Sequence, residues 1–269
     1  ARLSRAEYDH KWHGRYLEDV EHSIIKAEWF ESAVDAIDKL KLRNHVLSAS
    51  IVGAFDPADV GGDAKGYAFR QGIHFFDVGE SMIEDGNAAC DEVTALARQH
   101  DCELFVWDGD GMGALLRRQV EQAFKRCETR MYKGSNSVDD PDVPYEGSWA
   151  EGQKTNKQMF HNKRAQYYTK LAERFYATHR AVEKGEYIDP DLLISIDGNM
   201  KSLNKLKAET CRIPRKINAT TGKIQIMSKD EMKRKYKIDS PNMADCLAMS
   251  MESPDVTKTR TKIRFESFW

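Results

Sequence analysis

The chain has 269 residues, 41% of them hydrophobic and 31% charged, which is typical of a folded globular protein with room for one large domain or two small ones. No apolar run approaches the roughly 18 residues that a membrane-spanning helix needs, so the sequence gives no argument for a membrane protein. The five cysteines never form CxxC spacing, which favours reduced core thiols in a cytosolic setting over disulfides or zinc ligands.

The net charge of −2 conceals a strong division of charge along the chain. Residues 50–110 contain 13 acidic and 3 basic side chains, whereas residues 201–237 contain 12 basic and 3 acidic ones. Such a division suits a cation site beside a track for a polyanion. Solvated helix faces would produce the same composition. This simpler interpretation of the basic half therefore stays open.

The N-terminal residues 1–42 have apolar positions near helical spacing, and we expect a peripheral helical segment that links or docks. The chain begins with Ala rather than Met, and no signal-peptide pattern follows. We therefore expect a mature or excised piece of a longer protein.

A buried strand is predicted over residues 46–55, and it ends abruptly at Asp56, before Pro57 and a glycine pair. The Asp56 carboxylate therefore lies at the C-terminal end of the strand. Residues 67–78 then predict two strands with a turn at Gln71-Gly72, and residues 87–100 predict a helix.

A second strand with the same layout covers residues 104–107 and runs into Asp108 and a glycine-broken loop. Two carboxylates at the ends of two core strands indicate a metal site. Taken alone, Asp56 before a proline is also a turn initiator, and Asp108 with Asp110 is also a loop former.

The middle of the chain continues the alternation of helices and strands. A helix is predicted over residues 114–127, a short strand over 129–132, and a loop over 135–152 that is either a lid or a surface excursion. The helix predicted over residues 162–182 places Tyr168 on its buried side and Arg164 on its polar side. A Lys-rich helix and a strand over residues 223–227 follow, and the whole pattern indicates an α/β fold.

A third carboxylate lies near the end of the chain, in the segment 239–251. Ser240 is the expected N-cap and Pro241 the first helical residue, so Asp245 lies a little over one turn into the helix. The positive end of the helix dipole helps to keep this carboxylate ionised and able to bind a metal. A purely electrostatic role at the helix start is the alternative, but three coincident carboxylates favour a site.

The ordered set of these motifs resembles the nuclease domain of the large terminase subunit, the DNA-packaging motor protein of tailed bacteriophages. The resemblance runs from about Lys41 to the last helix, through strand-Asp56-Pro57, VWDGDGMG, NKRAQYYTKLAERF, GKIQIMSK and SPNMAD. It implies a ribonuclease H-like nuclease domain over residues 43–269, with a central mixed β-sheet flanked by helices, and it makes residues 1–42 similar to the end of the linker from the motor domain. No GxxxxGK[ST] motif is present, so we expect no packaging ATPase activity from this chain.

The resemblance also implies an activity and a site. The activity is metal-dependent endonucleolytic cleavage of concatemeric double-stranded viral DNA, and the family's three metal-binding aspartates fall on Asp56, Asp108 and Asp245. Hydrolysis of a phosphodiester by two divalent ions needs hard oxygen ligands, which suit Mg²⁺ or Mn²⁺. We expect Asp56 to bridge both ions, with Asp108 on one and Asp245 on the other.

Other predicted site residues have weaker support. Asp59, Asp63 and Asp110 are either auxiliary ligands or plain loop residues. The predicted DNA-binding residues are Lys201, Lys205, Lys207, Lys229 and Lys233, and Lys229 and Lys233 are the candidates for a contact with the scissile phosphate.

The partners that the resemblance implies are double-stranded DNA and, for the full-length protein, the portal and the small terminase subunit, in the host bacterial cytoplasm at the procapsid portal. Two other interpretations stay open. One is a nuclease of the PD-(D/E)xK class, because Asp56-Pro57 and Asp63-Ala64-Lys65 imitate its motif. The other is a non-enzymatic DNA-binding or capsid-docking module whose acidic cluster is structural.

Overall fold

The computed structural model describes residues 23–57, 64–147 and 153–254. Two of the expected auxiliary carboxylates, Asp59 and Asp63, lie outside these ranges, as does the N-terminal half of the expected linker.

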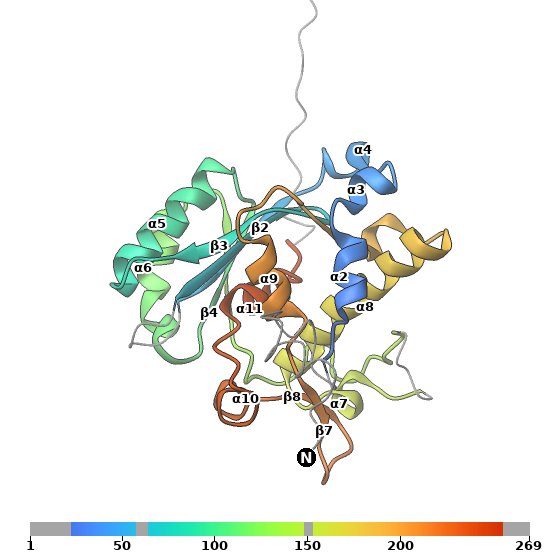
Figure 1. Ribbon diagram of the computed structural model, residues 1–269. Coiled ribbons are helices and arrows are strands. Elements are labelled where there is room, and N and C mark those ends of the chain that lie inside the picture. The colour runs from blue at the N-terminus through green and yellow to red at the C-terminus, as the bar shows by residue number, and fades with distance from the viewer. Residues whose placement is uncertain (1–22, 58–63, 148–152, 255–269) are drawn as a thin grey trace, which may run out of the picture.

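The described residues form a mixed six-stranded sheet with the order β5-β4-β1-β2-β3-β6 (Figure 1). Strands β1, β2 and β3 are antiparallel to one another in turn, whereas β4 is parallel to β1 and β5 is parallel to β4. This order confirms the predicted α/β class and ribonuclease H-like topology. The strands are β1 Ile51–Asp56, β2 Lys65–Gln71, β3 His74–Ser81, β4 Leu104–Asp108, β5 Glu128–Tyr132 and β6 Ser195–Ile196, with a separate pair β7 Arg215–Ile217 and β8 Ile224–Ile226.

The described helices surround this sheet, and none of them is long and apolar enough to cross a membrane. The α-helices are α2 Ala27–Ala33, α3 Ala36–Lys39, α4 Arg43–Val46, α5 Gly86–Gln99, α6 Arg117–Ala123, α7 Asn156–Met159, α8 Lys163–Lys184, α9 Leu203–Thr210, α10 Lys229–Tyr236 and α11 Asn242–Met249. The single helix predicted over residues 114–127 is instead a 3-10 turn, η1 Gly111–Leu116, followed by α6. The backbone segments at Gly113 and Asp108 approach each other closely, since a Cβ atom at Gly113 would lie 1.7 Å from the Asp108 carbonyl oxygen.

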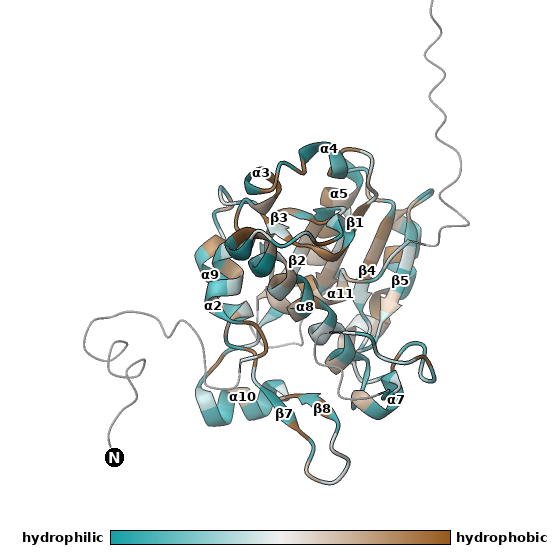
Figure 2. Cartoon of the chain, turned by 90° about the vertical axis from the view of Figure 1, so that its right-hand side faces the viewer, coloured by the Kyte–Doolittle hydropathy of each residue, from teal (hydrophilic) through white to brown (hydrophobic). Residues whose placement is uncertain are grey.

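Alternation along the central strands sends side chains to two separate cores. Phe55 and Phe105 pack toward α5 and α6, whereas Ala54 and Val106 belong to the core beneath α8 and α11. Figure 1 shows α5 and α6 on one side of the sheet and α8, α9 and α11 on the other. Because side chains alternate with a period of two, the last residues of β1 and β4 lie on the α11 side. Hydrophobic colour is concentrated in the central strands, and α10 is mainly hydrophilic (Figure 2).

The described part of the expected N-terminal linker packs into the core beneath α8. Ile24 and Ile25 are buried, and the Phe30 ring of α2 stacks on Phe175 of α8 with 5.6 Å between ring centroids. Residues 23–42 therefore share a hydrophobic core with the sheet.

The two helices that matter most for the site begin in different ways. Helix α8 has a side-chain cap of its own, because Asn162 Oδ1 accepts a hydrogen bond from Ala165 N at 3.0 Å. Helix α11 has none: Pro241 occupies the N-cap position, so the prediction of a Ser240 cap is wrong. The first amides of α11 donate instead to the Glu209 carboxylate of α9.

The described part of the loop over residues 135–152 is tied to α8. The Asp139 amide donates to Gln166 Oε1 at 2.8 Å, and its carboxylate accepts a hydrogen bond from the Tyr167 hydroxyl at 2.6 Å. The five cysteines are free thiols, four of them buried, as the sequence predicts.

Candidate active site

The three predicted aspartates meet at one cavity of about 260 Å³. Asp56 ends β1 and Asp108 ends β4, and these strands are parallel neighbours with Phe55 opposite Trp107, so the two carboxylates stand side by side on the α11 face. Asp245 enters from α11, which lies over that face. The cavity is also lined by Pro57, Asp110, Gly111, Tyr132, Gly134, Arg164, Tyr168, Ser228, Lys229, Ala248 and Met249.

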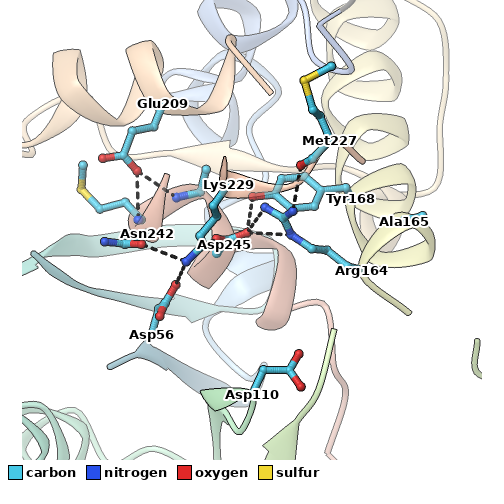
Figure 3. Close-up of polar contacts among 12 residues, drawn as sticks. Asp56, Asp110, Arg164, Ala165, Tyr168, Glu209, Met227, Lys229, Asn242 and Asp245 are labelled. Carbon is cyan, nitrogen blue, oxygen red and sulfur yellow. Dashed lines mark hydrogen bonds and ion pairs between the residues drawn. The ribbon is translucent and has the colours of Figure 1, made fainter. Parts of the chain in front are cut away.

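Asp245 is 8% exposed and both of its carboxylate oxygens are engaged. Oδ1 accepts hydrogen bonds from the Tyr168 hydroxyl at 2.7 Å and from Arg164 Nη2 at 3.0 Å, while Oδ2 lies 3.2 Å from Lys229 Nζ (Figure 3). Burial by itself would raise the pKa of Asp245, but the charges of Arg164 and Lys229 and the Tyr168 bond lower it below its ordinary value. The carboxylate therefore stays ionised and has a fixed orientation.

Lys229, the first residue of α10, joins two of the aspartates. Its Nζ lies 3.1 Å from Asp56 Oδ2 as well as close to Asp245, and it donates to Asn242 Oδ1 at 3.1 Å (Figure 3). Burial would lower the pKa of Lys229, but the Asp245 and Asp56 carboxylates outweigh that effect and raise it. The ammonium group therefore remains protonated between the two carboxylates.

Asp108 has a different environment from Asp245. The hydrogen bond that it accepts comes from the Asp110 amide at 2.9 Å, and no cationic side chain in the described ranges donates to it. Burial raises the pKa of Asp108 to about 7, and the Asp56 and Asp245 charges push in the same direction. Asp108 is thus the carboxylate that an added cation would stabilise most.

The chemistry of this donor set fits a hard divalent cation. Three carboxylates converge on an open cavity, and their oxygens are the ligands that Mg²⁺ and Mn²⁺ prefer. As they stand, no three acidic, histidine or cysteine side chains of the described residues are grouped to hold a metal ion. Lys229 and Arg164 supply positive charge at Asp56 and Asp245.

Two other predicted residues take positions away from the centre. Asp110 lines the cavity, but its carboxylate accepts hydrogen bonds from the amide and hydroxyl of Ser135. Lys65, which the PD-(D/E)xK interpretation requires at the site, is 7% exposed at the start of β2 and does not line the cavity.

Of the five lysines predicted to bind DNA, Lys229 alone lines the cavity. Lys205 forms an ion pair with Glu80, and Lys207 Nζ lies 2.6 Å from Glu31. Lys201 and Lys233 are exposed and lie outside the cavity wall. Part of the basic segment therefore neutralises acidic side chains of the same chain.

The sequence prediction missed Arg164 and Asn242 as site residues. Arg164 was expected on the polar side of α8, yet it points to Asp245 together with Tyr168. The four-residue spacing between Arg164 and Tyr168 puts both on one helix face, and it was the available signal. Asn242 had no comparable signal, because its side-chain partners are the Ala64 carbonyl, just before β2, and Lys229 of α10.

The sheet order and the carboxylate cavity at its edge define a nuclease domain of the ribonuclease H-like class. Solved structures agree. The nuclease domain of the large terminase subunit gp2 of bacterial virus Sf6 is 45% identical to this chain, covering 87% of this chain and 100% of that one with a TM-score of 0.80. A lysine-to-alanine variant of that domain with manganese and beta-thujaplicinol gives the same values, and one with calcium is 45% identical over 86% of this chain and 100% of that one, with a TM-score of 0.79.

The chain belongs to the family of nuclease domains of the large terminase subunit, the DNA-packaging motor of tailed bacteriophages. Its role is that of a nuclease in packaging. No protein-family model and no curated protein sequence matches it.

Proposed function

We propose that this chain is a divalent-metal-dependent endonuclease that cuts concatemeric double-stranded viral DNA during genome packaging. Membership of the terminase nuclease family supports the hydrolytic role. The single observation that carries the metal dependence is the meeting of Asp56, Asp108 and Asp245, from two strands and a helix, in one cavity.

The proposed ligands are the three aspartates, with Mg²⁺ or Mn²⁺ as two ions. Similar nuclease domains hold manganese or calcium, which supports an oxygen-ligated divalent site. When bound, such ions activate the attacking water and neutralise charge on the phosphate and the leaving oxygen. The raised pKa of Asp108, about 7, means that this ligand loses its proton only near neutral pH unless a cation assists.

The other cavity residues orient the ligands and receive the substrate. Tyr168 and Arg164 fix the Asp245 carboxylate through three hydrogen bonds to the same oxygen. Lys229 and Arg164 place positive charge in the cavity wall, where a negatively charged phosphate must approach. Lys229 is therefore the proposed phosphate contact among the predicted DNA-binding lysines.

The biological setting is also a proposal. In the full-length protein the nuclease domain would work with the portal and the small terminase subunit, in the host bacterial cytoplasm at the procapsid portal. These assignments rest on the terminase family alone.

The test is degradation of a supercoiled plasmid by the purified chain with Mn²⁺, Mg²⁺, Ca²⁺ or excess chelator. We expect cleavage with Mn²⁺ and Mg²⁺ and none with chelator. Asp→Asn at Asp56, Asp108 or Asp245 should each abolish cleavage, and pairs of these changes should add little because the ligands act as one unit. Cleavage that persists undiminished in chelator would contradict the proposal.

Asp239→Asn is a suitable control, because this exposed carboxylate lies six residues before Asp245 and does not line the cavity. Lys65→Ala should be mild, whereas the PD-(D/E)xK interpretation requires it to abolish cleavage and tolerates Asp245→Asn. A non-enzymatic DNA-binding module would bind DNA without cutting it, and calorimetric titration with Mn²⁺ would then show no site dependent on the three aspartates.

A further inference from the structure

Helix α11 is capped from outside by a carboxylate of another helix. Glu209 Oε2 accepts hydrogen bonds from the Met243 amide at 2.9 Å and the Ala244 amide at 3.3 Å (Figure 3). These are amides of the first turn, which a side chain at the N-cap normally satisfies. Pro241 occupies the N-cap and offers no such group. The start of α11 therefore depends on a residue that lies 34 positions earlier in the chain.

The Glu209 carboxyl group lies in surroundings that disfavour its charged form. Burial raises the pKa of Glu209 to about 8, with Glu80 adding to the effect, while the two amide bonds and Lys205 oppose it. A carboxyl that is retained in such surroundings needs a compensating interaction, and the two amides of α11 are the contacts that supply it.

The first turn of α11 carries the parts of the site that need exact placement. Asp245 directly follows Ala244, whose amide is held. Asn242 starts the helix, and its side chain donates to the Ala64 carbonyl and accepts from Lys229 Nζ. The turn also lies directly on β2, because a Cβ atom at Gly66 would be only 2.5 Å from the carbonyl group of Asn242.

We propose that Glu209 is a positioning residue of the nuclease: by fixing the first turn of α11, it sets the place of Asp245 and, through Asn242, that of Lys229. The inference rests on the proposed metal-dependent cleavage. Glu209 itself does not line the cavity, so it acts through α11 and not on the substrate.

The test compares two helix caps that differ in what their helices carry. Asp85 caps α5 through a 2.7 Å hydrogen bond from the Ala88 amide, and no described residue of α5 lines the cavity. Glu209→Ala and Asp85→Ala should both lower thermal stability, because each loses a cap. Only Glu209→Ala should lower kcat for plasmid cleavage in Mn²⁺, by about 10- to 100-fold, as expected when a catalytic group moves by a fraction of an ångström to one ångström.

Three further readouts separate positioning from general destabilisation. KM for the plasmid should change less than kcat, because the contact of Lys229 with Asp56 does not depend on α11 and keeps the ammonium group in the cavity wall. Glu209→Gln keeps an acceptor oxygen and should recover most of the rate. Amide hydrogen exchange at Met243 and Ala244 should accelerate in Glu209→Ala and stay slow in Asp85→Ala, and this measurement does not depend on activity.

The outcomes distinguish this inference from the proposed function. A wild-type chain that does not cleave with Mn²⁺ or Mg²⁺ overturns the proposed function, while hydrogen exchange still reports on the cap. If the wild type is active and Glu209→Ala cleaves the plasmid as fast as Asp85→Ala, the positioning role is overturned. If the alanine variant does not fold, Glu209→Asp replaces it, since it retracts the carboxylate by one methylene. A wild-type rate and slow exchange in that variant would also overturn the inference.

Discussion

Asp108→Asn should stabilise the metal-free protein at neutral and alkaline pH while abolishing cleavage. The carboxylate has an ordinary pKa of 3.8, which burial and the charges of Asp56 and Asp245 raise to about 7. Folding therefore becomes less favourable as pH rises from about 4, where the unfolded chain ionises, to about 7, where the folded chain does. Asparagine keeps the acceptor for the Asp110 amide and carries no charge.

The magnitude follows from the size of that shift. A shift of about 3 units corresponds to an upper limit of about 4 kcal/mol at pH 8, since each unit is worth about 1.4 kcal/mol. Partial solvent access to Asp108 reduces this, so we expect about 2 to 4 kcal/mol. At about 2 to 4 °C per kcal/mol for a chain of this size, the melting temperature should rise by about 4 to 16 °C.

Urea unfolding in chelator at pH 4, 6 and 8 measures this difference, with Asp239→Asn as the exposed control. The two proteins should be nearly equally stable at pH 4 and diverge as pH rises. Adding Mn²⁺ should reverse the order at pH 8, because binding to the native wild type stabilises it and the variant has lost a ligand. A variant that is less stable than wild type at pH 8 in chelator would refute the reasoning, as would a difference that does not change with pH.

Three other measurements test neighbouring parts of the structure. Tyr168→Phe removes a 2.7 Å hydrogen bond to the buried Asp245 carboxylate. The free energy of unfolding in urea should fall by about 1.5 to 3 kcal/mol, and cleavage should be slower. An unchanged stability would show that this hydrogen bond does not form. Glu209→Gln should gain stability relative to wild type as pH rises from about 4.5 through about 8, because the raised pKa of Glu209 makes the wild type lose stability across that window; urea unfolding at pH 6 and 9 decides this. DNA binding should weaken steeply with salt. Lys201→Glu should weaken binding without removing an ion pair among the described residues, whereas Lys205→Glu also breaks the pair with Glu80. Fluorescence anisotropy measures the affinity, and an unchanged affinity for both variants would leave this face without a role in DNA binding.

Local patterns in the sequence were enough for the ends of the strands that carry Asp56 and Asp108. The start of the first strand was predicted too early, because Val46 ends α4 and β1 begins at Ile51. Each carboxylate follows a short apolar run directly and precedes turn-forming residues, so its place at a strand end depends on neighbours in the chain. The ordered motifs also led to the fold class, which the sheet order confirms. The start of the last helix was predicted one residue too early, because the group that caps it is not local.

Tertiary packing decided which charged groups meet. Lys229 reaches Asp56 across 173 positions, and Arg164 reaches Asp245 across 81. Helical periodicity shows which residues share a face. An amphipathic pattern, however, does not distinguish a cation that faces water from a buried cation that pairs with a distant carboxylate. The same limit applies to Lys205, whose charge looked available for DNA until α9 placed it beside Glu80. The sequence by itself thus identified the candidate ligands. The packing of α8, α9, α10 and α11 against the sheet determined their partners, because ion pairs depend on distances in space and not on separation along the chain.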